Sequence, residues 1–189
     1  MNVIGIGNGG IGGYTVHHLD RLIELKQIKN MNFTFYDDDK VELKNILYQN
    51  FTTKDIDSYK SDALSYRYFN INFNIKRLDY NDLKQCDLVI LCADNNKIRH
   101  EAYRNWIDNR IPFIDSRANG RAIGIFSSDT KNYEQTLSSD TKSSSCQNPF
   151  QIERKEIEYG NVVIASILAQ IILNYSRSNK LPVDLQLML

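Results

Sequence analysis

Short apolar runs alternate along the chain with longer segments in which apolar residues recur at helical spacing. A short continuous apolar run predicts a buried strand, whereas spacing of three to four positions predicts a helix with one buried face. We expect strands at Asn2–Gly7, Asn32–Tyr36, Ile71–Ile75, Asp87–Ala93, Pro112–Asp115, Ala122–Phe126 and Val183–Leu189. We expect helices at Gly10–Lys29, Asp57–Phe69, Asn96–Asn109 and Gly160–Tyr175.

The alternation of strands and helices favours parallel pairing through right-handed crossovers. It predicts an α/β fold, with a Rossmann-like, doubly wound, mostly parallel sheet, helices on both faces and possible antiparallel edge strands near the C-terminus. No linker divides the sequence, so we expect residues 1–189 to form one domain. Residues 127–149 are rich in Ser, Asp, Thr and Lys, which predicts a flexible crossover-type surface loop.

The equal numbers of basic and acidic residues limit the classes of binding partner that the sequence favours. Lys and Arg total 23, as do Asp and Glu, so nothing favours nucleic acid or an anionic membrane. The most apolar segment, 162–173, is too short to cross a bilayer. We expect no signal peptide, because the first residues already read as a strand. An odd number of cysteines without short paired spacing argues against disulfides and structural zinc, and favours the reducing cytoplasm.

A glycine-rich turn lies between the first expected strand and the first expected helix. In this context Gly7 permits a tight turn, Gly9 and Gly10 let the backbone approach a phosphate, and Gly12 lets the helix pack on the strand. The helix N-terminus then offers free N–H groups to the anion. Asp37 ends the second strand, where a carboxylate accepts hydrogen bonds from ribose hydroxyls. These features favour an adenosine ligand without separating ATP from NAD.

The segment from Asp37 to Gln49 is more specific. It resembles the signature Asp-x-Asp-x-Val-x-x-(Ser)-Asn-Leu-x-Arg-Gln of the adenylating-enzyme superfamily of ThiF, MoeB and the ubiquitin-activating enzymes. Lys60 follows where that family places a phosphate-binding lysine. The stretch from Asp94 to Arg99 is similar to the family's Asp-Asn-x-x-x-Arg element. The resemblance is good over residues 1–126 and looser over the last helix.

The resemblance implies a function, cofactors and a partner. A member of this family uses ATP and Mg²⁺ to adenylate the C-terminal carboxylate of a small ubiquitin-like or sulfur-carrier protein that ends in Gly-Gly. Such a member is usually a homodimer, and we expect one here because the last helix is too apolar to face water. Asp94 is the expected Mg²⁺ ligand, and Lys60 the expected ligand of phosphate oxygens. The nucleotide-binding set then comprises Gly7, Gly9, Gly10, Gly12, Asp37, Asp39, Asn45, Gln49, Lys60, Asp94, Asn95 and Arg99.

Some features depart from the family pattern. Tyr48 stands where the family has an arginine, and we expect the N-terminal helices of MoeB-like proteins, which lend an arginine to the partner subunit's site, to be missing. Arg67, Arg99 or Arg117 could substitute. Cys146 lies near the position of the family's nucleophilic cysteine, and it is either a nucleophile or an incidental loop thiol.

Two alternatives to an adenylating enzyme stay open. The first is a catalytically degenerate module of the same fold that binds a nucleotide or a partner protein. The second is a small NAD-binding oxidoreductase, against which the segment from Asn45 to Gln49 argues.

Overall fold

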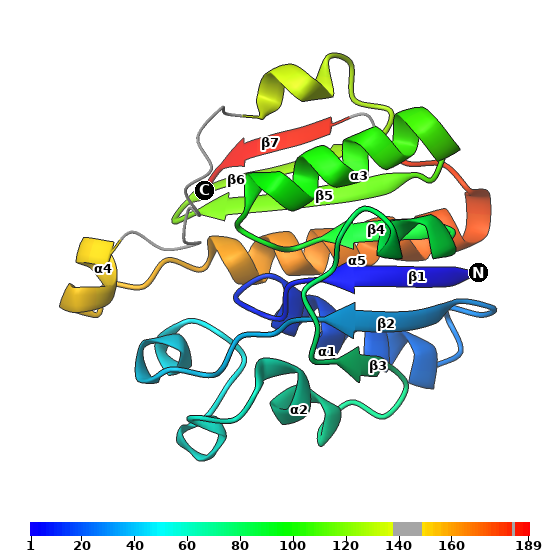
Figure 1. The fold of residues 1–189 in the computed structure, drawn as a ribbon. Helices are drawn as coiled ribbons and strands as arrows, with labels where there is room; N and C mark the ends of the chain where they lie inside the picture. Colours follow the sequence, from blue (N-terminus) through cyan, green and yellow to red (C-terminus); the bar gives the residue numbers. More distant parts are fainter. Residues whose placement is uncertain (138–148, 183) are drawn as a thin grey trace.

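The protein is described by a computed structural model that covers residues 1–137, 149–182 and 184–189. Its centre is a seven-stranded sheet in the order β3-β2-β1-β4-β5-β6-β7 (Figure 1). The strands are β1 (Asn2–Ile6), β2 (Asn32–Tyr36), β3 (Asn72–Asn74), β4 (Leu88–Leu91), β5 (Phe113–Asn119), β6 (Ala122–Ser127) and β7 (Asp184–Met188). The α-helices are α1 (Gly12–Glu24), α2 (Lys60–Ser65), α3 (Asn96–Asn109), α4 (Pro149–Arg154) and α5 (Gly160–Ser178).

The sheet confirms the predicted fold class. Strands β1 to β5 pair in parallel, with Ile6 of β1 opposite Tyr36 of β2 and Leu91 of β4. Strands β5, β6 and β7 pair antiparallel at the other end of the sheet. Order β3-β2-β1-β4-β5 with parallel pairing is the Rossmann arrangement, in which the strand order reverses between β1 and β4. Ligands of such sheets bind at that switch point, beyond the carboxyl ends of the strands.

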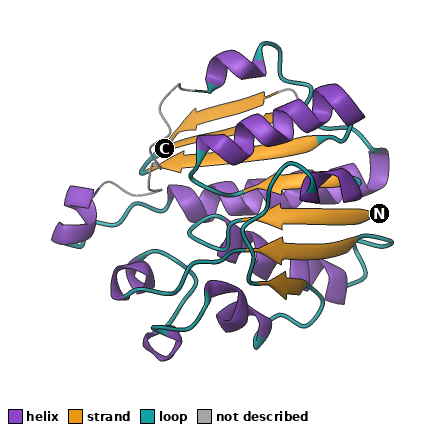
Figure 2. Cartoon of the chain, in the orientation of Figure 1, coloured by secondary structure: helices purple, strands orange, loops and turns teal. Residues whose placement is uncertain are grey.

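Helices cover both faces of the sheet (Figure 2). Helices α1 and α5 lie together behind the sheet in this view, and α3 crosses in front of it. The larger core lies between the sheet and the α1–α5 pair, where Val16, Leu19 and Leu168 are fully buried. A second core lies under α3 and includes Leu83, Leu91 and Phe113. The two cores account for the near-continuous apolar sequence of β4, whose residues are buried on both faces.

Helix α2 is shorter than the sequence indicates. The prediction of a helix over Asp57–Phe69 is wrong at both ends, because the α-helix occupies only Lys60–Ser65. Asp57 has a left-handed backbone with φ of 69°, and Tyr59 is extended and forms an isolated bridge to Lys40. Neither conformation continues a helix. At the start of α2, Lys60 N donates to the carbonyl oxygen of Asp39 and Lys60 Nζ pairs with the Asp39 carboxylate, so the helix begins against the acidic stretch after β2.

The region after β6 holds more structure than a surface loop. A 3₁₀ helix, η4 (Tyr133–Thr136), follows the strand, and Tyr133 is 1% exposed among the aromatic rings of Tyr103, Phe113 and Phe126. The predicted loop at 127–149 thus contains a core residue. Cys146 lies outside the described residues.

The apolar residues of α5 are buried or partly buried within the chain. Ile164, Leu168 and Ile172 pack into the core with α1 and the sheet, whereas Ser166 and Gln170 face outward. The apolarity of this helix therefore no longer argues for a dimer, which stays a prediction. No helix among the described residues is long and apolar enough to span a membrane.

Candidate functional site

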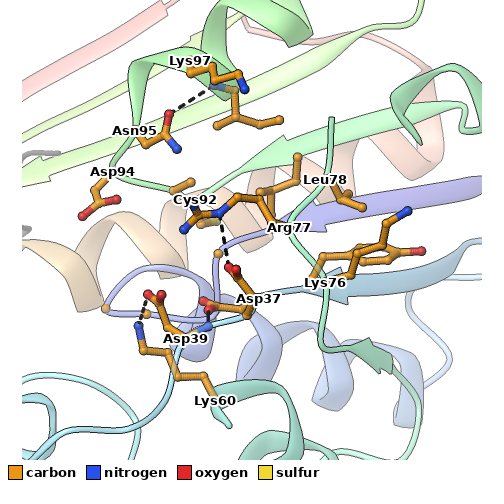
Figure 3. Close-up of a pocket in the computed structure, with 18 of the residues that line it drawn as sticks. Asp37, Asp39, Lys60, Lys76, Arg77, Leu78, Cys92, Asp94, Asn95 and Lys97 are labelled. Carbon is orange, nitrogen blue, oxygen red and sulfur yellow. Dashed lines mark hydrogen bonds and ion pairs between the residues drawn. The ribbon is translucent and has the colours of Figure 1, made fainter. Parts of the chain in front are cut away.

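A pocket of about 480 Å³ lies at the switch point, beyond the carboxyl ends of β1, β2 and β4. Its size is typical of a site for a small organic ligand. Glycines of the first turn form part of one wall, and the acidic stretch after β2 forms another. The segment of residues 75–81, which joins β3 to the 3₁₀ helix η3 (Asp82–Gln85), contributes further side chains (Figure 3).

The glycine turn has the geometry that the sequence predicts. Gly7 has φ of +94°, and a Cβ there would stand 3.0 Å from the backbone of Cys92 and Ala93. A Cβ on Gly12 would stand 1.8 Å from the carbonyl oxygen of Gly7, so the first turn of α1 packs directly on the loop. Gly9 and Gly10 line the pocket. The start of α1, with N–H groups that have no partner inside the helix, therefore lies beside the pocket.

Asp37 is held at the pocket by two backbone N–H groups. Its Oδ2 accepts from Asn8 N at 2.6 Å, and its Oδ1 accepts from Asp39 N at 2.8 Å. Burial raises the pKa of this carboxyl, and Lys60 together with the two N–H groups opposes that effect. Each carboxylate oxygen keeps a lone pair, so Asp37 can accept from two ligand hydroxyls as well.

Lys60 lies at the same wall, 8% exposed, with its Nζ 2.8 Å from Asp39 Oδ2. Burial alone would lower the pKa of the ammonium, but Asp37, Asp39 and Asp94 outweigh it and raise the pKa. Lys60 is thus charged at neutral pH and already shared among carboxylates. A phosphate at this position would compete with Asp39 for the ammonium.

Asp94 and Asn95 follow β4 and have different roles. Asn95 is the N-cap of α3, because its Oδ1 accepts from Ile98 N at 3.3 Å. Asp94 is exposed at the pocket and lies near enough to Lys60 to raise the pKa of that ammonium. Since Asn95 caps the helix, the carboxylate of Asp94 is available to a ligand or a metal ion.

Three of the expected site residues do not line the pocket, and the structure gives them structural roles instead. Gly12 packs against Gly7. Asn45 is buried and accepts from Glu42 N, which caps the 3₁₀ helix η1 (Leu43–Leu47). Arg99 is 5% exposed and pairs with Asp115 at 3.0 Å. Gln49 does line the pocket, and its Oε1 is buried without a hydrogen-bond partner.

The three arginines that could supply the positive charge that Tyr48 lacks also lie outside the pocket lining. Arg67 donates to the carbonyl oxygen of Asn50 at 2.9 Å, and Arg117 joins Arg99 on Asp115. None of the three lines the pocket. Tyr48 itself is 7% exposed and lines the pocket without adding charge.

Sequence reasoning missed two features of the site. Asn161, 1% exposed in the first turn of α5, donates to the carbonyl oxygens of Tyr48 at 2.6 Å and Gly10 at 3.3 Å. It therefore ties the glycine turn to the wall that carries Gln49. The second feature is a set of basic residues, Lys76, Arg77 and Lys97, that line the pocket. A polar residue beside Gly160 at the start of an apolar helix, and a basic pair just after β3, were the available signals.

The acidic side chains suit a hard cation. Oxygen atoms of Asp37, Asp38 and Asp39 lie within 4.8 Å of one another. Asp94, which follows β4, lines the same pocket as Asp37 and Asp39 (Figure 3). Carboxylates are ligands that Mg²⁺ accepts, together with water and substrate phosphates. The two cysteines in the described part of the chain, Cys86 and Cys92, are buried, and burial raises the pKa of Cys86 to about 11.

Comparison with known proteins decides the family. A model of the ThiF family matches residues 1–184. The chain belongs to the ThiF family. This confirms the resemblance found in the glycine turn and in the segment from Asp37 to Gln49. None of the curated proteins matches the chain in sequence.

Solved structures share the ThiF fold of the chain at low sequence identity. PaaA is 19% identical, with a TM-score of 0.68 over all of this chain and 60% of its own. MccB from E. coli, in a complex with AMPCPP and MccA, is 17% identical, with a TM-score of 0.67 and the same coverage. MccB with ATP gives a TM-score of 0.64 at 17% identity, again over 100% of this chain and 60% of that one. The chain spans about 60% of the length of these proteins.

Proposed function

We propose that this ThiF-family chain binds ATP with Mg²⁺ and adenylates a carboxylate on a peptide or small protein. The observation that carries the proposal is the pocket at the switch point, where the glycine turn, the Asp37 carboxylate and Asp94 face one cavity. The ATP and AMPCPP complexes of the neighbour MccB support the nucleotide, and the MccA in one of them supports a peptide acceptor.

Each group has a task that its position supports. Asp37, fixed by Asn8 and Asp39, accepts from ribose hydroxyls. The backbone at Gly9 and Gly10 and the start of α1 bind phosphate oxygens. Gln49 presents a carboxamide whose oxygen has no protein partner, so it can hydrogen-bond to the nucleotide or the acceptor.

The reaction joins two anions. A carboxylate oxygen of the acceptor attacks the α-phosphorus of ATP and forms an acyl–phosphate bond, while the bond to the β-phosphate breaks and its electron pair leaves with pyrophosphate. The described residues that line the pocket include six carboxylates and only four cationic side chains. A triphosphate would therefore add negative charge to a site that is already acidic. Mg²⁺, which Asp94 would hold, supplies the compensating charge.

The acceptor we propose is the C-terminus of a small ubiquitin-like or sulfur-carrier protein that ends in Gly-Gly. A short peptide is the competing acceptor. Isotope exchange between pyrophosphate and ATP, measured with a Gly-Gly carrier and with peptides of varied C-terminus, tests the reaction. We expect exchange that requires an acceptor and Mg²⁺ and that is lost in Asp94→Ala, with the exposed Asp108→Ala as matched control. ATP binding without exchange with any acceptor would leave only nucleotide binding.

A second candidate function is the degenerate binding module. The specific observation in its favour is that Tyr48 adds no charge while Lys60, Arg67, Arg99 and Arg117 are committed to protein partners. The NAD-binding oxidoreductase has no such observation. NAD⁺ titrated against ATP-loaded protein tests it, and we expect no displacement of ATP.

A further inference from the structure

The segment of residues 75–81 crosses one side of the pocket and is fixed at its middle. Leu78, 7% exposed, packs into the core under α3 with Ile6 and Leu91. A turn follows in which Asp79 accepts from Asn81 N at 2.8 Å. Arg77 precedes Leu78 and its side chain extends from this segment across the pocket, toward the acidic stretch after β2 (Figure 3). The backbone that carries Arg77 is therefore held in place, while its side chain is free to change rotamer.

The present partner of Arg77 holds it weakly. Its Nε lies 3.4 Å from Asp38 Oδ1, and the two side chains are 73% and 42% exposed. Exposed ion pairs of this kind add little stability. By contrast, Lys60 is buried and hydrogen-bonded to Asp39, and Lys76 is hydrogen-bonded to Asp82. Arg77 can therefore leave its partner at lower cost than either lysine.

The excess of negative charge in the pocket favours binding of an anionic ligand to Arg77. The lining carboxylates outnumber the cations, so phosphate groups that enter need a cation that is not already committed. A guanidinium binds two phosphate oxygens at once in a planar, bidentate arrangement. Lys97 also lines the pocket, but it projects from α3 on the side of Asn95, away from Asp37 (Figure 3).

We propose that Arg77 leaves Asp38 and binds the phosphate groups of the nucleotide, so that its side chain closes this side of the pocket over the ligand while the backbone of residues 75–81 stays in place. This inference rests on the proposed function, since it requires that ATP occupies the pocket. It assigns Arg77 a direct contact with the substrate, on a segment outside the glycine turn and outside the stretch from Asp37 to Gln49.

Calorimetric titration with adenosine, AMP and ATP, each with Mg²⁺, tests the assignment. In Arg77→Gln we expect the dissociation constant of ATP to rise about tenfold or more, that of AMP to rise or hold, and that of adenosine to change by less than about twofold. Arg77→Lys should recover part of the ATP affinity, because it restores the charge without the bidentate geometry. Arg21→Gln is the matched control, because Arg21 is exposed, paired with Glu24 and absent from the pocket lining.

Three results would overturn the inference and leave the proposed function standing. Unchanged ATP affinity in Arg77→Gln would show that the side chain does not touch the phosphates. An equal loss for adenosine and ATP would assign Arg77 to the base or ribose instead. A phosphate-dependent loss in Lys97→Gln but not in Arg77→Gln would move the role to α3. Failure of the wild-type protein to bind ATP would refute the proposed function, and the inference with it.

Discussion

Individual side chains of the site are held by partners that determine what each can still do. Asp37 is fixed by two N–H groups and keeps lone pairs for a ligand, whereas the ammonium of Lys60 is committed to Asp39. Asn161 touches no ligand position directly, yet both of its hydrogen bonds end on backbone that forms the pocket wall. Asp37 and Asn161 therefore call for different experiments, one on charge and one on position.

Asn161→Ala should weaken both stability and ATP binding. The change leaves the buried carbonyl oxygens of Gly10 and Tyr48 without a donor, which costs about 1–3 kcal/mol of unfolding free energy. We expect the ATP dissociation constant to rise several-fold, because the glycine turn and the Gln49 wall are no longer joined. Urea unfolding and calorimetry measure the two effects. Asn174→Ala, on the exposed face of the same helix, is the control and should change neither. Equal ATP affinity in Asn161→Ala and wild type would contradict the positioning role.

The raised pKa of Asp37 predicts how ATP affinity depends on pH. Burial raises this pKa, so on acidification Asp37 takes up a proton at a higher pH than an ordinary aspartate does. The carboxylate that we propose accepts from ribose exists above that pKa, so affinity should fall as pH drops through it. Asp37→Asn should bind ATP weakly, with a flatter profile across the same range. Circular dichroism at each pH checks that the protein stays folded. A wild-type affinity that rises on acidification would contradict the assignment.

Strands and helices meet at a buried ionic cluster beside the site. Asp115 of β5 is fully buried and pairs with Arg99 of α3 and Arg117 of the same strand, and it accepts from the hydroxyl of Tyr133 in η4. One carboxylate thus joins three elements. Arg99 also donates to the carbonyl oxygen of Ala93 at 2.7 Å, which fixes the backbone just before Asp94.

Asp115→Asn should destabilise the fold strongly. The amide leaves two largely buried guanidinium groups without their counter-charge, and loss of one partner of a buried pair costs about 3–5 kcal/mol. Tyr133→Phe removes the hydrogen bond of the hydroxyl to Asp115 but leaves both ion pairs of Asp115, and it should cost about 1 kcal/mol. Urea unfolding measures both, with the exposed Asp108→Asn as control. A cost for Asp115→Asn no larger than that for Tyr133→Phe would show that the cluster does not hold the elements together.

How much the sequence could predict depends on how far apart along the chain the interacting residues lie. The strands β1, β2 and β4 and the turn at Gly7 are encoded by neighbouring residues, and they were predicted to within a residue or two. The start of helix α2 was placed too early because Tyr59 bridges to Lys40 and Asp57 N donates to the carbonyl oxygen of Val41, and these partners are not neighbours in the sequence. Arg77 and Asn161 join the site only through the fold, so the basic pair after β3 and the polar residue beside Gly160 could not be assigned to the pocket from the sequence.

The molecule as a whole is a Rossmann-like sheet whose switch point carries the pocket, and the antiparallel end of the sheet stands apart from it. Membership of the ThiF family and this placement of the pocket are both consistent with the proposed binding of ATP. The homodimer remains a prediction, which light scattering of the purified chain tests. A monomer at all concentrations would refute it.

The central claim is that this pocket binds ATP, and a crystal structure with Mg²⁺ and AMPCPP tests it most directly. The methylene group of AMPCPP replaces the bridging oxygen between the α- and β-phosphates, so the bond that breaks in adenylation stays intact. We expect the ribose hydroxyls on Asp37, phosphate oxygens at the N–H groups of Gly9 and Gly10, and Arg77 turned from Asp38 to the phosphates. A nucleotide bound elsewhere, or a pocket that stays empty at saturating ligand, would contradict the claim.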